Sequence, residues 1–170
     1  MIWSGCSFDY APTNLDEEFP EQMPRTVLRG VEHSVIEENQ IVALLRIKRV
    51  ESYHEKSLML LSGIHFTEFN SAGVAVTEVW ADQTKYNSET GDARAEGNVV
   101  MSSRREEARI TTTKLNWNDS DRLLTSDEGT LVMVQLKDES IVTGVDFEAD
   151  IARRVFRFLG PVSGELVPNQ

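Results

Sequence analysis

Apolar and polar residues between Val79 and Met101 follow the pattern of a β-hairpin. The first run ends at the aromatic residue Tyr86, and the polar residues 87–91 that follow supply a turn. The return run is interrupted at Gly97 and then continues through the apolar residues 99–101. The stretch therefore predicts two antiparallel strands, the second of which is broken at Gly97.

The same pattern, an aromatic residue before a polar turn and a glycine after the return strand, occurs at three other places. The aromatic residues are 33, 31 and 30 positions apart. Self-similarity at such a period is typical of a repeated supersecondary unit, so the chain is predicted to be a ladder of hairpins. The four aromatic and glycine pairs are Tyr53 and Gly63, Tyr86 and Gly97, Trp117 and Gly129, and Phe147 and Gly160.

Residues 31–62 contain no glycine or proline, and their apolar positions fit a helix as well as strands. The later chain is clearer, because turn-forming residues at 70–73, 118–121 and 137–140 separate short runs rich in β-branched and aromatic residues. Short strands divided by turns at such intervals predict an all-β fold, which is a sandwich, a jelly roll or a solenoid.

Composition narrows the class of protein. The 170 residues are enough for one domain with its own core, and 40% hydrophobic with 26% charged residues is ordinary for a folded protein. The formal charge of −11 argues against nucleic acid as a partner, because phosphate binding needs a basic face. No window of about 18 consecutive apolar residues is present.

The single cysteine, Cys6, follows small residues near the start of the chain, as in the tail of a bacterial lipoprotein signal. Cys6 is therefore predicted to be a lipidation site or, alternatively, an ordinary thiol in a terminal segment. Residues 7–25 contain three prolines and an acidic cluster without periodicity, which favours a flexible tether. The alternative is an ordered arm packed through Phe8, Tyr10 and Phe19.

Motifs for catalysis and metal binding are missing from the sequence. The three histidines, His33, His54 and His65, lack the close spacing of zinc ligands, and residues 118–121 lack the glycine and distal glutamate of a calcium loop. No nucleophile elbow, phosphate-binding loop or dinucleotide fingerprint occurs. We therefore expect neither an enzyme nor a bound cofactor.

The hairpin at residues 81–100, with Ala-Asp-x-x-x-aromatic before its turn and Gly-Asn-Val after it, resembles the LptC family of lipopolysaccharide-export proteins and the related LptA and OstA domains. The likeness continues through residues 110–117, 126–127, 143–150 and the closing 159–164, in the order and spacing of that family. It covers about residues 28–164, and only residues 30–53 match loosely.

The resemblance implies an open, twisted β-jelly roll of two antiparallel sheets with an apolar groove for the acyl chains of a glycolipid. It divides the chain into an N-terminal tether at 1–25, the jelly-roll domain at 26–165 and a tail at 166–170. The implied function is a non-enzymatic lipid-transport scaffold of outer-membrane biogenesis. It would lie in the periplasm and be anchored to the inner membrane through Cys6, where the best-known members carry a membrane helix.

The implied partners are lipopolysaccharide or another glycolipid, the LptF and LptG-like subunits of an inner-membrane ABC transporter, and an LptA-like bridge that pairs with an edge strand. Head groups are expected to face solvent or the basic residues Arg104, Arg105, Arg153 and Arg154. Two other functions stay open, a structural or interaction lipoprotein with a closed β-sandwich core and the soluble LptA-like bridge itself.

Residues two apart on a strand share a face, and this gives the apolar pairs that line the expected groove. If the same residues pack against one another, they form a closed core instead. The predicted lipid-binding residues are Val79, Ala81, Val99, Met101, Ile110, Leu115, Trp117, Leu131, Met133, Phe147, Phe156 and Phe158.

Overall fold

The computed structural model describes residues 23–53, 57–165 and 167. The predictions made for Cys6, for most of the tether and for most of the C-terminal tail concern residues outside this description. Within the described residues the fold is all-β and contains no helix. The predicted all-β fold of consecutive hairpins is confirmed. The helical alternative for residues 31–62 is wrong, because residues 31–37, 40–53 and 58–62 of this stretch lie in long strands.

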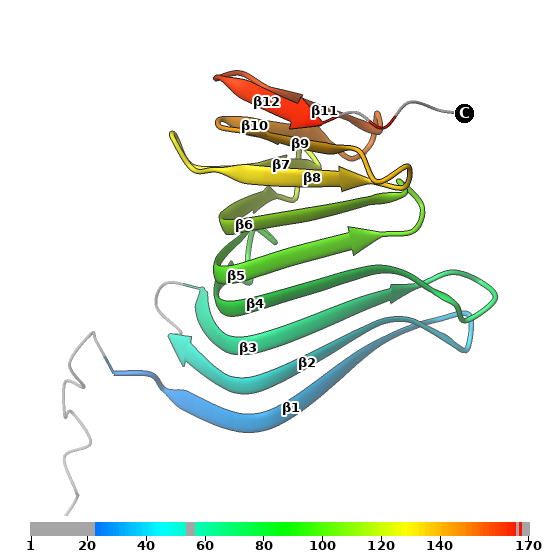
Figure 1. Ribbon diagram of the computed structural model, residues 1–170. Helices are drawn as coiled ribbons and strands as arrows, with labels where there is room; N and C mark the ends of the chain where they lie inside the picture. The colour runs from blue at the N-terminus through cyan, green and yellow to red at the C-terminus, as the bar shows by residue number, and fades with distance from the viewer. Residues whose placement is uncertain (1–22, 54–56, 166, 168–170) are drawn as a thin grey trace, which may run out of the picture.

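Six long strands form a meander in which each strand pairs antiparallel with the next (Figure 1). Asparagines close three of the turns, because the side-chain oxygens of Asn70, Asn87 and Asn118 accept backbone N–H groups two to four residues further on. The strands are β1 (Thr26–Glu37), β2 (Gln40–Tyr53), β3 (Leu58–Phe69), β4 (Ala75–Asn87), β5 (Ala93–Ser103) and β6 (Ala108–Asn118).

The sheet forks at β6, whose two halves pair with different strands. Residues 108–112 pair with β8, and residues 116–118 pair with β7. One arm continues as β7, β10 and β11, and the other as β8, β9 and β12, so that all twelve strands belong to one sheet. The later strands are β7 (Leu123–Thr125), β8 (Val132–Leu136), β9 (Ile141–Gly144), β10 (Phe147–Asp150), β11 (Val155–Phe158) and β12 (Val162–Glu165).

Pairing is interrupted along one line that crosses all six long strands. Between β1 and β4 the facing residues on this line are left out of the ladder without a change of register, and on β5 two residues, Gly97 and Asn98, oppose a single residue of β6. Such an irregularity bends a sheet. The curvature of β1 to β3 is visible in Figure 1. The line runs through Gly30, Lys48, Gly63, Asp82, Gly97, Asn98 and Thr113.

The line divides the sheet into two limbs. Limb A contains residues 49–53 of β2 and the arm β7, β10 and β11, and limb B contains residues 40–47 of β2 and the arm β8, β9 and β12. Buried residues on either side of the line are three apart, as in Ile47 and Val50 or Ala81 and Thr84, rather than two or four. The break thus resets the alternation, and the same face of the sheet is buried in both limbs.

The two limbs lie against each other at the forked end. Leu115 of limb A and Val99 of limb B belong to one core cluster, and the ring of Phe158 on β11 lies against Gly144 on β9. A Cβ atom on Gly144 would lie 2.7 Å from that ring. The core is therefore formed by folding one sheet over itself along the interrupted line.

Glycine is required at the bend for two separate reasons, and these can be tested at Gly63. Its φ of +60° lies in the left-handed region, and a Cβ atom there would lie 2.6 Å from Cδ of Lys48. Gly73 has a similar φ of +72° in the β3–β4 turn, with nothing within 4 Å. Gly73→Ala is expected to lower the free energy of unfolding by about 1 kcal/mol, and Gly63→Ala by more, in urea titrations. Equal losses would show that the close approach of Lys48 imposes no constraint.

Candidate functional site

The face shared by the two limbs, here called the inner face, carries apolar side chains in rows that run across the strands in register. One row of limb B joins Leu45, Phe66 and Val79, and continues beyond β4 through Met101 and Ile110. Residues in register on neighbouring strands have side chains within contact distance on one face. The inner face is therefore a continuous apolar surface from β2 to the fork.

Limb A carries matching rows opposite. The first joins Val50, Leu61 and Thr84, and continues through Ala95 and Leu115. Most of these side chains belong to two clusters, and the half-buried Ile64 packs against both clusters. The apolar interior is thus continuous along the molecule, although its buried residues fall into two groups.

Burial differs between the two ends of the inner face. At the forked end Val99 and Val132 are 0% exposed and Phe147 is 1% exposed, so this end is filled by side chains of the protein itself. Toward β1 the inner residues of β2 to β4 are mostly half-buried, and Leu28 on β1 is 49% exposed. The interior is therefore closed at the forked end and incompletely covered at the β1 end.

Eight of the twelve residues predicted from the sequence are brought together in the cluster at the forked end. Four of them are buried and four are half-buried partners of the cluster. Val79 lies on the same inner row, opposite Met101. Phe156 lies at the β11 edge, where it is 40% exposed and its ring centroid is 6.1 Å from that of Phe147. The eight are Ala81, Val99, Met101, Ile110, Leu115, Trp117, Phe147 and Phe158.

The prediction that Leu131 and Met133 face the interior is wrong. Val132 and Val134 are the buried residues of this stretch, at 0% and 1% exposure, whereas Leu131 is 61% and Met133 is 42% exposed. The reason is the register with β6, in which Val132 pairs with the buried Thr112. Since side chains alternate along a strand, the residues on either side of Val132 point away from the core.

Several inner-face residues of β2, β3 and β4 were missed by sequence reasoning. Runs such as Leu58 to Leu61 are apolar at every position and give no alternation from which a face could be chosen. Gly63 was part of the repeated pattern and was the available signal, because it marks the bend around which these residues are arranged. The missed residues are Leu45, Ile47, Val50, Met59, Leu61, Ile64, Phe66 and Tyr86.

The outer face of limb A is polar and is held together by an ion-pair network. The guanidinium of Arg94 donates two hydrogen bonds to the carboxylate of Asp127, at 2.9 and 2.6 Å, and one to Glu96 at 2.6 Å. The amide of Asn116 donates to the same Asp127 carboxylate at 2.9 Å. The network ties β5 and β6 to the segment that follows β7.

These contacts shift the pKa values of three groups, and the pKa of Tyr53 is shifted elsewhere on the sheet. Hydrogen bonds from Asn116, and then from Arg94, hold the pKa of Asp127 below its ordinary value. The hydrogen bond from Arg94 also lowers the pKa of Glu96, and its bonds to Glu96 and then to Asp127 raise the pKa of Arg94. Burial, followed by a hydrogen bond to Glu51, raises the pKa of Tyr53. Each charged group is thus paired, as expected of a structural network.

The basic residues expected to meet head groups are mostly engaged. Arg105 pairs with Glu68, Arg153 with Asp150 and Arg154 with Glu106, at 3.2 to 3.5 Å. Arg104 lies exposed in the β5–β6 turn. These four arginines do not form a common cationic site.

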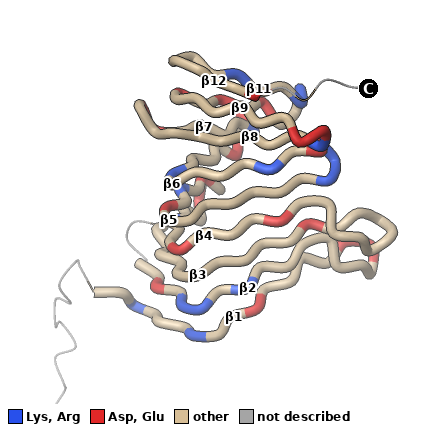
Figure 2. Tube along the Cα trace, in the orientation of Figure 1, with Lys and Arg blue, Asp and Glu red and all other residues tan. Residues whose placement is uncertain are grey.

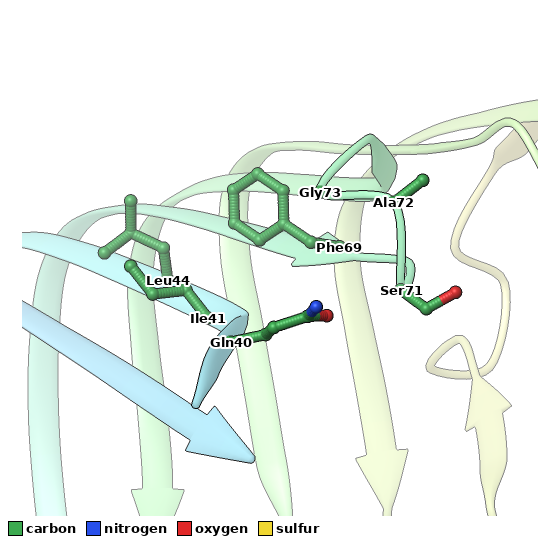
Figure 3. Close-up of a pocket in the computed structure, with 7 residues that line it drawn as sticks. All are labelled: Gln40, Ile41, Leu44, Phe69, Ser71, Ala72 and Gly73. Atoms are coloured by element: carbon green, nitrogen blue, oxygen red, sulfur yellow. The ribbon is translucent and has the colours of Figure 1, made fainter. Parts of the chain in front are cut away.

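A shallow hollow of about 500 Å³ lies where the β1–β2 hairpin meets the β3–β4 turn (Figure 3). The side chains of Ile41, Leu44 and Phe69 line it together with residues 71–73. None of the predicted lipid-binding residues borders it.

Two of the three histidines lie on strands of the sheet. His65 stacks on Trp80 with 4.8 Å between ring centroids, and His33 lies on β1. In the described residues no cluster of His, Cys, Asp or Glu has the arrangement of a metal site, and no helix there is long and apolar enough to cross a membrane.

Comparison of the chain with models of known protein families gives no match, and comparison with curated proteins gives none either.

The Asp127 network predicts a dependence of stability on pH. A carboxylate whose pKa is lowered by folding stabilises the folded state above its ordinary pKa of about 4, and this contribution is lost as the pH falls through the lower, folded-state value. Asp127→Asn is therefore expected to lower the free energy of unfolding at pH 7, with a penalty that shrinks toward pH 2 to 3 in urea titrations. Asp121→Asn, in an exposed turn, is the control with the same loss of charge. A penalty for Asp127→Asn that is independent of pH would contradict this reading.

Proposed function

We propose that this protein is a non-enzymatic lipid-transport scaffold of the kind that LptC represents, and that it holds the acyl chains of a glycolipid such as lipopolysaccharide. The observation that carries the proposal is the inner face over β2 to β4, where in-register apolar side chains such as Phe66 and Val79 are only half-buried. An apolar surface of this kind gains stability when further apolar groups cover it.

The finer fold belongs to the same proposal. Limb A and limb B act as the two antiparallel sheets of an open, twisted β-jelly roll, and the interrupted line is the edge along which they join. The reset alternation at Ile47 and Val50 supports this, because it gives both limbs an apolar inner side. The groove is the space between the limbs toward β1.

The energetics suit a carrier. Burial of each acyl methylene contributes about 0.8 kcal/mol, so a chain of a dozen carbons contributes on the order of 10 kcal/mol before the losses of binding entropy. The hydrophobic interaction that holds the acyl chain is non-directional, so the inner face by itself does not move the lipid in one direction. Direction must then come from ATP hydrolysis by a separate transporter.

The proposed partners follow from the two ends of the sheet. LptF and LptG-like subunits of an inner-membrane ABC transporter deliver the glycolipid, and an LptA-like jelly roll receives it by pairing with an edge strand. The edge strands are β1 at one end and β11 and β12 at the other. Exposed edges favour pairing with a further strand. The scaffold lies in the periplasm, attached to the inner membrane through a lipidated Cys6.

A second function, a membrane-anchored interaction protein with a closed core, is favoured by the forked end. The complete burial of Val99, Val132 and Phe147 shows that the interior at that place is filled by the protein's own side chains. Under this alternative the β1 end is covered by a protein partner instead of a lipid. The soluble LptA-like bridge differs from both in carrying no anchor, so the mass of the mature protein at Cys6 separates it.

Cross-linking from Phe66 tests the proposal directly. A photoreactive benzoylphenylalanine in place of Phe66 faces the inner side, whereas the same residue in place of the adjacent His65 faces the outer side beside Trp80. After irradiation of native membranes, mass spectrometry is expected to find a glycolipid adduct at position 66 and none at position 65.

A third variant at Phe147, which is 1% exposed, controls for lipid that enters any apolar site. Adducts at 65 and 66 in equal amounts would show non-specific contact with membrane lipid. A protein adduct at 66, without lipid, would favour the closed-core interaction protein.

A further inference from the structure

Basic residues gather at the β1 end of an otherwise acidic protein. Residues 25–53 have a net charge of +1, whereas the rest of the chain has a net charge of −12. Figure 2 shows Lys and Arg positions along β1 and β2. We call this group the basic strip, and its members are Arg25, Arg29, Arg46, Lys48 and Arg49.

The strip lies on the side of the sheet opposite the inner face. Arg29 follows the inner residue Leu28, and Arg46 and Arg49 directly precede the buried residues Ile47 and Val50, so all three point to the other side. Arg25 lies one residue before β1 and continues the alternation of that strand. The basic side chains therefore share an exposed surface at the edge of the sheet.

The register between β1 and β2 places two of these cations against each other. Arg29 and Arg49 are direct partners across the antiparallel pair. Like charges in this position destabilise a sheet. An arrangement that is unfavourable for folding is explained if an anionic partner covers it.

Acidic neighbours compensate the strip only in part. Arg46 pairs with Glu32 at 2.9 Å and Arg49 pairs with Glu51, yet both arginines stay 54% and 42% exposed. Arg25, Arg29 and Lys48 form no ion pair with another residue of the described chain. Their charges are thus available to an external anion.

The features of the strip fit a broad anionic surface rather than a small anion. The strip spans two strands, lies outside the hollow lined by Ile41 and Phe69, and holds no buried charge. An apolar side chain lies among the cations, because Val27 shares their side of β1 and is 39% exposed. Basic and apolar side chains on one surface bind the head groups and the upper acyl region of a phospholipid membrane.

We infer that the basic strip docks on a membrane surface that contains anionic phospholipid. Phospholipid is favoured over nucleic acid for two reasons. An exposed apolar side chain such as Val27 is buried in the acyl region of a membrane but not against phosphodiesters, and the acidic remainder of the protein repels an extended polyanion. Where the inference invokes the anchor it rests on the proposed function: Cys6 lies 19 positions before Arg25, and one acyl anchor with one basic patch makes a stable two-part attachment.

Vesicle sedimentation with the full, unlipidated chain tests the inference without the anchor. Vesicles of phosphatidylcholine alone are compared with vesicles containing phosphatidylglycerol at about three parts in ten, at low and at high NaCl. We expect binding only to the anionic vesicles and loss of binding at high salt. The variant Arg29→Glu with Lys48→Glu should bind roughly tenfold more weakly or worse.

The charge-matched control is Arg104→Glu with Arg109→Glu, which reverses two exposed cations in the β5–β6 turn and on β6 and should bind as the unmodified chain does. Arg29→Glu also places a carboxylate opposite Arg49, so the variant is expected to fold, and circular dichroism is the measurement that checks this. A second variant, Arg29→Gln with Lys48→Gln, should show an intermediate loss.

Three results would overturn the inference. One is equal binding to neutral and anionic vesicles, and another is an equal loss in the strip variant and the control. The third is binding that appears only after Asp16, Glu17 and Glu18 are neutralised, because the strip would then be occupied by the acidic stretch of the same chain. None of these results affects a lipid adduct at position 66, so failure of the inference is distinct from failure of the proposed function.

Discussion

The interrupted line of pairing through Gly30, Gly63 and Gly97 is the constraint on which the rest of the structure depends. A single antiparallel meander has two faces, and the described chain has no helix to cover either of them. The sheet buries one face only by folding over itself, and that requires every long strand to bend at the same height. Left-handed φ values at the three glycines, and at Asn98, provide the bend. The fork at β6 begins at Thr113, on the same line, so the bend and the two arms have a common origin.

Closure along this line is uneven, and the unevenness follows from strand length. The short strands β7 to β12 form two narrow arms whose side chains reach one another, which gives the fully buried Phe147 and Val132. Toward β1 the strands have 12 to 14 residues, and the inner residues farther from the interrupted line, such as Leu45 and Phe66, are half-buried. One sheet thus contains a self-filled core and an incompletely covered apolar surface, joined through Ile64. The lipid-carrier proposal relies on the incompletely covered surface, and the closed-core alternative relies on the self-filled core. The two differ in whether a lipid or a protein partner covers the apolar surface toward β1.

Local signals in the sequence were sufficient for the turns and for the all-β class. Asn87 and Asn118 close turns by hydrogen bonds within a few residues, and the break at Gly97 was visible as a glycine before the apolar residues 99–101. The inner face was predictable only where the alternation stayed in phase. Val99 and Met101 fit that condition, but the pairing of Val132 with Thr112 reverses the face expected for Met133. Pairing across the fork is a long-range property, and no pattern within β8 specifies it.

Charge is distributed unevenly along the strand order, and this asymmetry can orient the molecule, which apolar burial alone cannot do. On the outer face of limb A, Arg94 is balanced by Glu96 and Asp127, so the middle of the sheet presents paired charges and little net field. At β1 the balance fails, since Arg29 faces Arg49 and the remainder of the chain is acidic. A charge asymmetry along the strand order orients a molecule on any charged surface, because the basic end is attracted to anions while the acidic end is repelled. On the proposed function, the same asymmetry would hold the incompletely covered end of the inner face toward the membrane and the forked end away from it.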